Sequence, residues 1–154
     1  MKIQDLLRKN SILINLDTID KISLITQMGK YLCTLYDLKN SDLIIQKILE
    51  RESQVSTGIG YGIAIPHARV EGIENIYMIA SKLAKGIEYN AIDDQPVHLV
   101  FMMVSPLVAS VNYTNILSSL SRILSFEEIR KNLLEAEDAE KFLNIIIEAE
   151  NKHI

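Results

Sequence analysis

Three histidines and one glycine-rich segment are the features of this 154-residue chain whose residue types could do chemistry. His67 directly follows Pro66 and the short apolar run 63–65, so its backbone is fixed at the end of a predicted strand. A neutral imidazole nitrogen can attack a phosphoryl group when a hydrogen bond to the other ring nitrogen selects the tautomer. His67 is therefore the first candidate for a phosphoryl acceptor.

A phosphoryl group also needs donors aimed at its oxygens, and the fork of an arginine suits this better than a lysine. Arg51 and Arg69 are the local candidates. The glycine-rich segment 58–62 precedes His67 and lets main-chain N–H groups approach an anion. A simpler interpretation stays open, in which His67 is a surface or half-buried loop histidine and the glycines form a tight connection between a helix and a strand.

The other histidines and motifs carry weaker signals. His98 lies in an apolar run where alternation places it opposite Val97 and Leu99, which is typical of a solvated or packed side chain. His153 is close to the C-terminus, and we expect it to be mobile. The sequence contains no G-x-x-x-x-G-K-[ST], H-E-x-x-H or G-x-S-x-G pattern, and its glycines do not form the dinucleotide fingerprint. We therefore expect neither a metal nor an organic cofactor.

Composition and charge exclude further classes. With 16 Lys+Arg, 20 Asp+Glu and a net charge of −4, the chain has no basic stripe and is not expected to bind nucleic acid. The longest apolar run, 99–104, is far shorter than the roughly 20 residues that span a bilayer, so no membrane insertion is expected. The single cysteine, Cys33, and the absence of a signal-peptide pattern indicate the cytoplasm.

The elements that must position these residues follow from hydrophobic periodicity. A strand is predicted over Ile12 to Leu16, followed by a helix from Thr18 to about Asp37 with Asp17 or Thr18 as its N-cap. Ser41 can cap a second helix, whose buried face carries Ile44, Ile45, Ile48 and Leu49 and whose end carries Arg51 and Glu52. Residues Ser53 to Gly62 are predicted to be a loop.

Three strands are predicted next, over 63–65, 76–83 and 97–104. A helix follows with Ile116 to Leu124 on one face, a capping box at Ser125 and Glu128 opens another, and a final helix begins at about Asp138. The order β-α-α-β-β-β-α-α-α predicts an α/β (α+β) fold. We expect a mixed central sheet of about four to five strands sandwiched by helices, in one domain covering residues 1–154.

The stretch Arg51 to Ala68, RESQVSTGIGYGIAIPHA, resembles the signature of type-2 enzyme IIA domains of the bacterial phosphoenolpyruvate-dependent phosphotransferase system. This group includes fructose, mannitol and nitrogen-regulatory members. The resemblance continues through AIDDQPVHLVF and LSSLSRIL. It implies that His67 accepts a phosphoryl group from the phosphocarrier protein HPr and that Arg51 clamps the phosphate. We expect N–H groups of a phosphate-binding loop to act as supplementary donors, at Ser56, Thr57, Gly58 and Gly60.

One position departs from the family pattern, because Tyr113 stands where a second histidine is usual. A tyrosine hydroxyl can donate a hydrogen bond to a phosphate oxygen, but it cannot carry positive charge as an imidazolium does. The alternative is a packed ring with its hydroxyl in water.

The resemblance implies two possible roles. Nitrogen-regulatory members stand alone and control partner proteins, whereas sugar-specific members pass the phosphoryl group to a IIB subunit. The chain from Met1 to Ile154 shows no fused IIB, IIC or HPr segment, and its AIDDQP turn looks closer to the regulatory members, so we expect that branch. A sugar-specific role remains the alternative. A binding module with little catalytic flux and a generic nucleotide or metal domain are further hypotheses.

Overall fold

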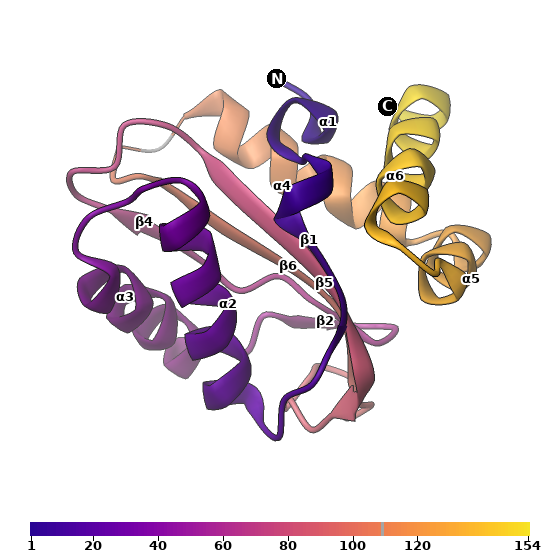
Figure 1. Cartoon of the computed structure of the whole chain (residues 1–154), viewed down its shortest axis with the longest axis horizontal. Coiled ribbons are helices and arrows are strands. Elements are labelled where there is room, and N and C mark those ends of the chain that lie inside the picture. The colour runs from indigo at the N-terminus through magenta and orange to yellow at the C-terminus, as the bar shows by residue number, and fades with distance from the viewer. Residues whose placement is uncertain (109) are drawn as a thin grey trace.

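A mixed sheet with helices on both faces forms the body of the protein, as seen in a computed structural model that describes residues 1–108 and 110–154 (Figure 1). The described residues form six strands: β1 (Ile12–Leu16), β2 (Gly58–Gly60), β3 (Ile63–Ala64), β4 (His67–Val70), β5 (Tyr77–Ile87) and β6 (Val97–Pro106). They also form six α-helices: α1 (Ile3–Leu6), α2 (Lys21–Leu35), α3 (Ser41–Gln54), α4 (Val111–Leu124), α5 (Glu127–Glu135) and α6 (Ala139–His153). The predicted fold class is confirmed.

The sheet order is β1-β5-β6-β3-β2, with β4 also paired to β6. The pairs β1–β5, β3–β6 and β4–β6 are parallel, and the pairs β5–β6 and β2–β3 are antiparallel. Ile63 pairs with Leu99 and His67 with Met103, so β3 and β4 continue in one register along β6. Pro66 interrupts them because it has no N–H to donate, although its carbonyl still accepts from the Met103 N–H at 3.1 Å.

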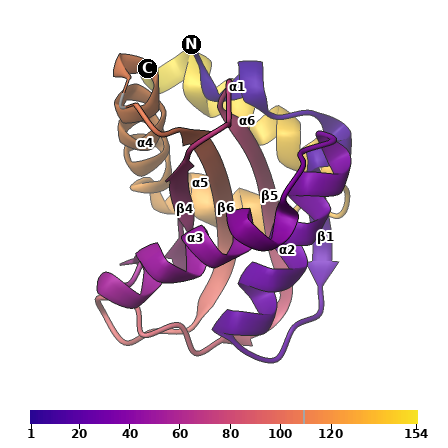
Figure 2. The same ribbon diagram turned by 90° about the vertical axis from the view of Figure 1, so that its left-hand side faces the viewer.

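Alternation along β6 divides the core between the two faces of the sheet. Leu99, Phe101 and Met103 pack in a cluster with residues of α4, α5 and α6, while Val100, Met102 and Val104 pack with α2 and α3. Figure 2 shows α2 and α3 lying across one face of the sheet. α2 and α3 approach closely at Gly29, where a Cβ atom would lie 2.6 Å from Ile45 Cγ1.

The chain ends are joined by a buried carboxylate. Glu150, in α6, is fully buried and accepts hydrogen bonds from the Ile3 N–H at 2.6 Å and the Gln4 N–H at 3.0 Å. The two termini consequently lie side by side (Figure 1). No helix in the described parts of the chain is long and apolar enough to cross a membrane.

The sheet has more strands than the four identified in the sequence, because β2 and β4 are only three and four residues long, too short for their alternation to be recognised. β2 is Gly-Ile-Gly, and it forms within the predicted loop Ser53 to Gly62 by pairing with β3. β4 carries His67 and Arg69 in alternation with buried residues and forms by pairing with β6. α3 also extends into the predicted loop, as far as Gln54.

Three predicted N-caps are wrong. Asp20 caps α2 by accepting the Ser23 N–H at 2.7 Å, so the cap is neither Asp17 nor Thr18. The sequence offers several cap-type residues here, and only the path from β1 selects one.

The capping box predicted at Ser125 and Glu128 does not form. The Ser125 hydroxyl instead donates to the Arg122 carbonyl at 2.6 Å, which satisfies the end of α4, and α5 begins after Phe126. Asn40 takes the cap position of α3 in a left-handed conformation, so Ser41 is the first helical residue. The last helix begins, as predicted, at about Asp138, which caps it by accepting the Lys141 N–H at 2.8 Å.

Candidate active site

His67 is the first residue of β4, at an edge of the sheet. Ala68 and Val70 point into the core beneath α2 and α3. Because side chains alternate along a strand, His67 and Arg69 lie on the opposite face, which is the face that α4 covers. His67 is half-buried there, and Arg69 is exposed.

A hydrogen bond fixes the tautomer of His67. Its Nδ1 lies 2.7 Å from the Ile65 carbonyl oxygen. A carbonyl oxygen only accepts, so Nδ1 carries the proton and the lone pair is on Nε2. Burial, the largest influence, lowers the pKa of His67, and the charges of Arg51 and Arg69 lower it further. The neutral ring with a free Nε2 lone pair is the form that a nucleophile requires.

A hollow of about 240 Å³ opens beside His67. Residues from α3, β4, the segment after β6 and α4 line it, so elements from both faces of the sheet meet here. The lining residues are Lys47, Glu50, Arg51, Gln54, His67, Ala68, Arg69, Leu107 and Tyr113. Lys47 is paired with Glu50 at 3.4 Å, so Arg51 and Arg69 are the cations beside the neutral imidazole that are left for a phosphoryl group.

Arg51 lies in the last turn of α3, and its guanidinium is anchored. Nη1 donates a hydrogen bond to the Val55 carbonyl at 2.9 Å. A guanidinium has five N–H donors, so it can hold this carbonyl and an oxyanion at the same time. This bond gives the side chain one orientation at the edge of the hollow.

Tyr113 lies in the first turn of α4, where its N–H donates to the Ser110 hydroxyl at 3.2 Å. Its ring centroid is 6.0 Å from that of His67, and the Arg69 guanidinium carbon is 5.8 Å from the centre of the Tyr113 ring. The fold therefore brings Arg51 and Tyr113, which are distant in the sequence, together with His67 and Arg69 of β4.

The predicted phosphate-binding loop does not line this hollow. The Thr57 N–H donates to Glu52 at 2.6 Å, and the Gly58 N–H donates to the Ser56 hydroxyl at 3.1 Å. Gly58 is instead needed for packing, because a Cβ atom there would lie 2.7 Å from the Ala91 Cβ. Gly60 has a φ of 97° and lies near Asp93. Of the four predicted donors Ser56, Thr57, Gly58 and Gly60, the N–H groups of Thr57 and Gly58 are thus already engaged within the protein.

Five lining residues were not identified as candidates from the sequence: Lys47, Glu50, Gln54, Ala68 and Leu107. Lys47 lies four residues before Arg51, so the two share one face of α3, and helical spacing could have identified it. Leu107 follows β6 and carries no sequence signal of its own.

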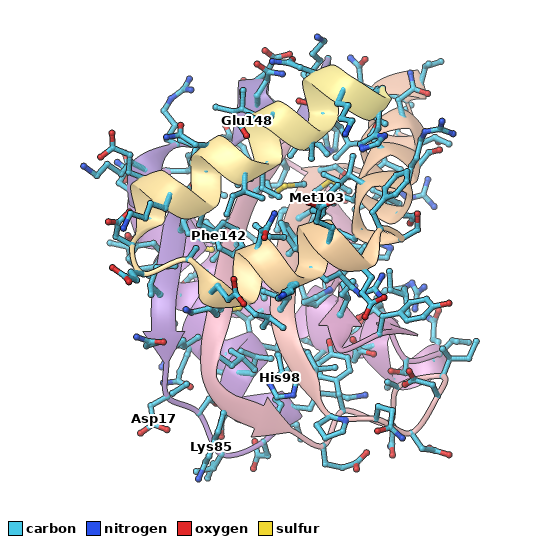
Figure 3. The ribbon with its side chains drawn as sticks, turned by 90° about the vertical axis from the view of Figure 1, so that its right-hand side faces the viewer. Asp17, Lys85, His98, Met103, Phe142 and Glu148 are labelled. Atoms are coloured by element: carbon cyan, nitrogen blue, oxygen red, sulfur yellow. The ribbon has the colours of Figure 1, made fainter. Side chains whose placement is uncertain are left out.

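The other histidines lie elsewhere. Figure 3 shows His98 toward one end of the sheet and Met103, the pairing partner of His67, toward the other. The His98 ring packs over Gly86, where a Cβ atom would lie 2.6 Å from its Cε1. His153 ends α6 and stacks on Phe126 with ring centroids 4.0 Å apart, so the expected mobile terminus is held by a contact. Across residues 1–108 and 110–154, no group of three or more His, Cys, Asp or Glu side chains is placed to hold a metal.

Comparison with known proteins gives consistent matches. The family model described as phosphoenolpyruvate-dependent sugar phosphotransferase system, EIIA 2, matches residues 5–149. The fructose-specific EIIABC component of Bacillus subtilis is 41% identical over 95% of this chain, which spans only 23% of that longer protein. The fructose-specific EIIA component of Haloferax volcanii is 37% identical over 70% of both chains. The crystal structure of nitrogen regulatory protein IIA-Ntr from Neisseria meningitidis superposes with a TM-score of 0.87, at 28% identity, over 94% of this chain and 98% of that one.

Proposed function

Since this chain belongs to the type-2 EIIA family of the phosphoenolpyruvate-dependent sugar phosphotransferase system, we propose that it is a phosphocarrier that accepts a phosphoryl group on Nε2 of His67. The observation that carries the proposal is the Nδ1 hydrogen bond to the Ile65 carbonyl, which leaves Nε2 as the nucleophile beside the basic hollow. The donor is phosphorylated HPr.

The transfer step needs no cofactor and balances with the two proteins alone. The Nε2 lone pair forms a bond to phosphorus, while the bond from phosphorus to the donor histidine nitrogen breaks and its electron pair stays on that nitrogen. The His67 ring then carries positive charge, which strengthens the Nδ1–H hydrogen bond to Ile65. Arg51 and Arg69 stabilise the charge on the phosphoryl oxygens.

Exposed apolar residues beside the hollow suit a protein donor. Leu107, which lines the hollow, is 55% exposed, and Val108 and Val111 are 81% and 74% exposed. An apolar surface around a basic centre favours docking of another protein over capture of a free small anion. HPr as donor and a IIB subunit or a regulated protein as receiver would use this surface.

The test is phosphorylation with phosphoenolpyruvate, enzyme I and HPr, read by intact mass. We expect one acid-labile phosphoryl group on the parent protein and none on His67→Ala. His98→Ala and His153→Ala are the matched controls and should be phosphorylated as the parent is. Equal labelling of His67→Ala would disprove the assignment.

We propose a regulatory role as the first of two candidates, in which the phosphorylation state of His67 controls the binding of partner proteins. The likeness to IIA-Ntr over nearly the whole chain supports it. The second candidate is a fructose-type carrier that passes the phosphoryl group to a separate IIB subunit, supported by the 41% identity to the Bacillus subtilis relative. Mixing the phosphorylated protein with a fructose-type IIB domain distinguishes them, because rapid transfer to IIB is expected only for the second.

A further inference from the structure

Glu52 is a buried carboxylate next to the site that the transfer step does not use. It follows Arg51 in the last turn of α3, and its side chain is 3% exposed. Successive helical residues point about 100° apart, so Arg51 reaches the hollow while Glu52 points into the protein. Burying a charge is costly unless donors surround it, and so the partners of Glu52 show what its charge holds in place.

Those partners converge on the segment that follows α3. Glu52 accepts hydrogen bonds from the Thr57 N–H at 2.6 Å, from the Thr57 hydroxyl, and from the Tyr89 hydroxyl at 2.5 Å. The Lys21 ammonium lies 3.4 Å from its Oε2 and also sits 4.4 Å from the centre of the Tyr89 ring. Burial and the neighbouring carboxylate raise the pKa of Tyr89, so its phenol stays a donor. The network ties α2, α3 and the chain before β6 to Thr57.

The same segment provides the anchor for Arg51. Val55, two residues before Thr57, accepts the Arg51 guanidinium through its carbonyl. The turn 55–57 is therefore held at Thr57 by the Glu52 network and used at Val55 by the proposed phosphate clamp. The charge of Glu52 also acts at His67, where it opposes the effect of the arginines on the pKa.

From these contacts we propose that Glu52 is a positioning residue for phosphoryl transfer, which fixes the Val55–Thr57 turn so that the Val55 carbonyl orients the Arg51 guanidinium toward His67. The inference rests on the proposed function of His67. It assigns no contact between Glu52 and the phosphoryl group. Its effect passes through Arg51, so it vanishes when Arg51 is absent.

The first experiment measures single-turnover transfer from phosphorylated HPr to the Glu52→Gln variant, normalised to the folded fraction. We expect a rate lower by about tenfold or more, since small misplacements of a clamp have effects of this size. The matched control is Glu150→Gln, which alters a second buried carboxylate, one that accepts hydrogen bonds from two backbone N–H groups away from the hollow. Both variants should be less stable, but Glu150→Gln should transfer within about twofold of the parent.

The second experiment repeats Glu52→Gln in an Arg51→Ala background. If Glu52 acts through Arg51, the added loss of rate is below about twofold there, while the loss of stability is unchanged. The proposal is overturned if the double variant loses rate by the product of the two single losses. It is also overturned if Glu52→Gln transfers as fast as the parent. Should Glu52→Gln fail to fold, Tyr89→Phe removes one hydrogen bond to Glu52 and is expected to give a smaller loss in the same direction.

A third measurement does not depend on transfer. The side-chain Nε–H of Arg51 should have a high NMR order parameter in the parent and a lower one in Glu52→Gln, with no change in Glu150→Gln. If the parent protein takes no phosphoryl group while Arg51 shows this response, the proposed function fails and the positional coupling stands. An unchanged Arg51 order parameter in Glu52→Gln refutes the coupling itself.

Discussion

Removal of the Tyr113 hydroxyl tests whether this residue takes part in phosphoryl binding. Tyr113→Phe leaves the ring, which lies 6.0 Å from His67 and contacts Arg69. Burial raises the pKa of Tyr113, an effect that Arg69 and Arg51 oppose. The hydroxyl is therefore protonated at neutral pH and can donate a hydrogen bond to a phosphoryl oxygen in the hollow that both residues line.

The expected loss follows from the strength of a hydrogen bond to a charged group, about 1.5–3 kcal/mol. Tyr113 is only half-buried, so the lower end of that range applies. About 1.4 kcal/mol corresponds to about a tenfold change in an equilibrium constant. Tyr113→Phe should thus lower the equilibrium constant for phosphoryl transfer from HPr to His67 by about tenfold.

The assay is the equilibrium ratio of phosphorylated to free protein at a series of phospho-HPr to HPr ratios. Tyr61→Phe is the matched control, because Tyr61 is exposed and packs against Arg130 at 4.4 Å outside the hollow. An equilibrium for Tyr113→Phe equal to that of the parent would refute the hydroxyl role and leave only a packed ring. Tyr113→His reports on the missing second imidazole, and faster exchange would mean that the tyrosine limits throughput.

Three other predictions concern charge and packing. Because the pKa of His67 is lowered in the folded protein, the unfolded chain protonates at this ring first as the pH falls. The free energy of unfolding should therefore decrease as the pH drops through the ordinary histidine value of 6.5. Arg51→Gln removes a charge that lowers the pKa of His67, so it should raise that pKa in an NMR titration. Gly29→Ala should destabilise the protein by about 1–3 kcal/mol in urea unfolding, because its Cβ meets Ile45, while transfer per folded molecule is unchanged. Lys82→Met should lower the free energy of unfolding by about 1–3 kcal/mol, because the Lys82 ammonium donates to two carbonyls at the end of α5. A urea midpoint equal to that of the parent would contradict this.

Much of the fold was predictable because its long elements have strong local patterns. β1 begins and ends at the predicted residues, and the final helix starts one residue after Asp138, close to its predicted start. The short strands β2 and β4 were not predictable, because three or four residues containing glycine, histidine and arginine carry no strand pattern. They become strands only because β3 and β6 supply hydrogen-bond partners.

The predictions of helix N-caps were wrong for a related reason. Several residues near each helix start can accept an N–H, and the choice depends on where the preceding element delivers the chain. Ser125 looks like the start of α5 by spacing, yet its hydroxyl closes α4. Local chemistry permits both outcomes, and packing selects one.

The sequence by itself determined the chemistry available to this protein. A histidine placed after a strand and a proline, arginines on either side of it in the chain, and a signature that resembles type-2 enzyme IIA domains are all local facts. They name His67, Arg51, Arg69 and Tyr113 without saying that these residues meet.

Only the tertiary structure decided the arrangement. Strand alternation turns His67 and Arg69 to one face, α3 brings Arg51 around the edge of the sheet, and α4 adds Tyr113. The glycine-rich segment does not line the hollow, and the Thr57 N–H before it donates to Glu52 inside the protein. A buried charge must find donors, and those donors lie at positions that only the fold brings within reach.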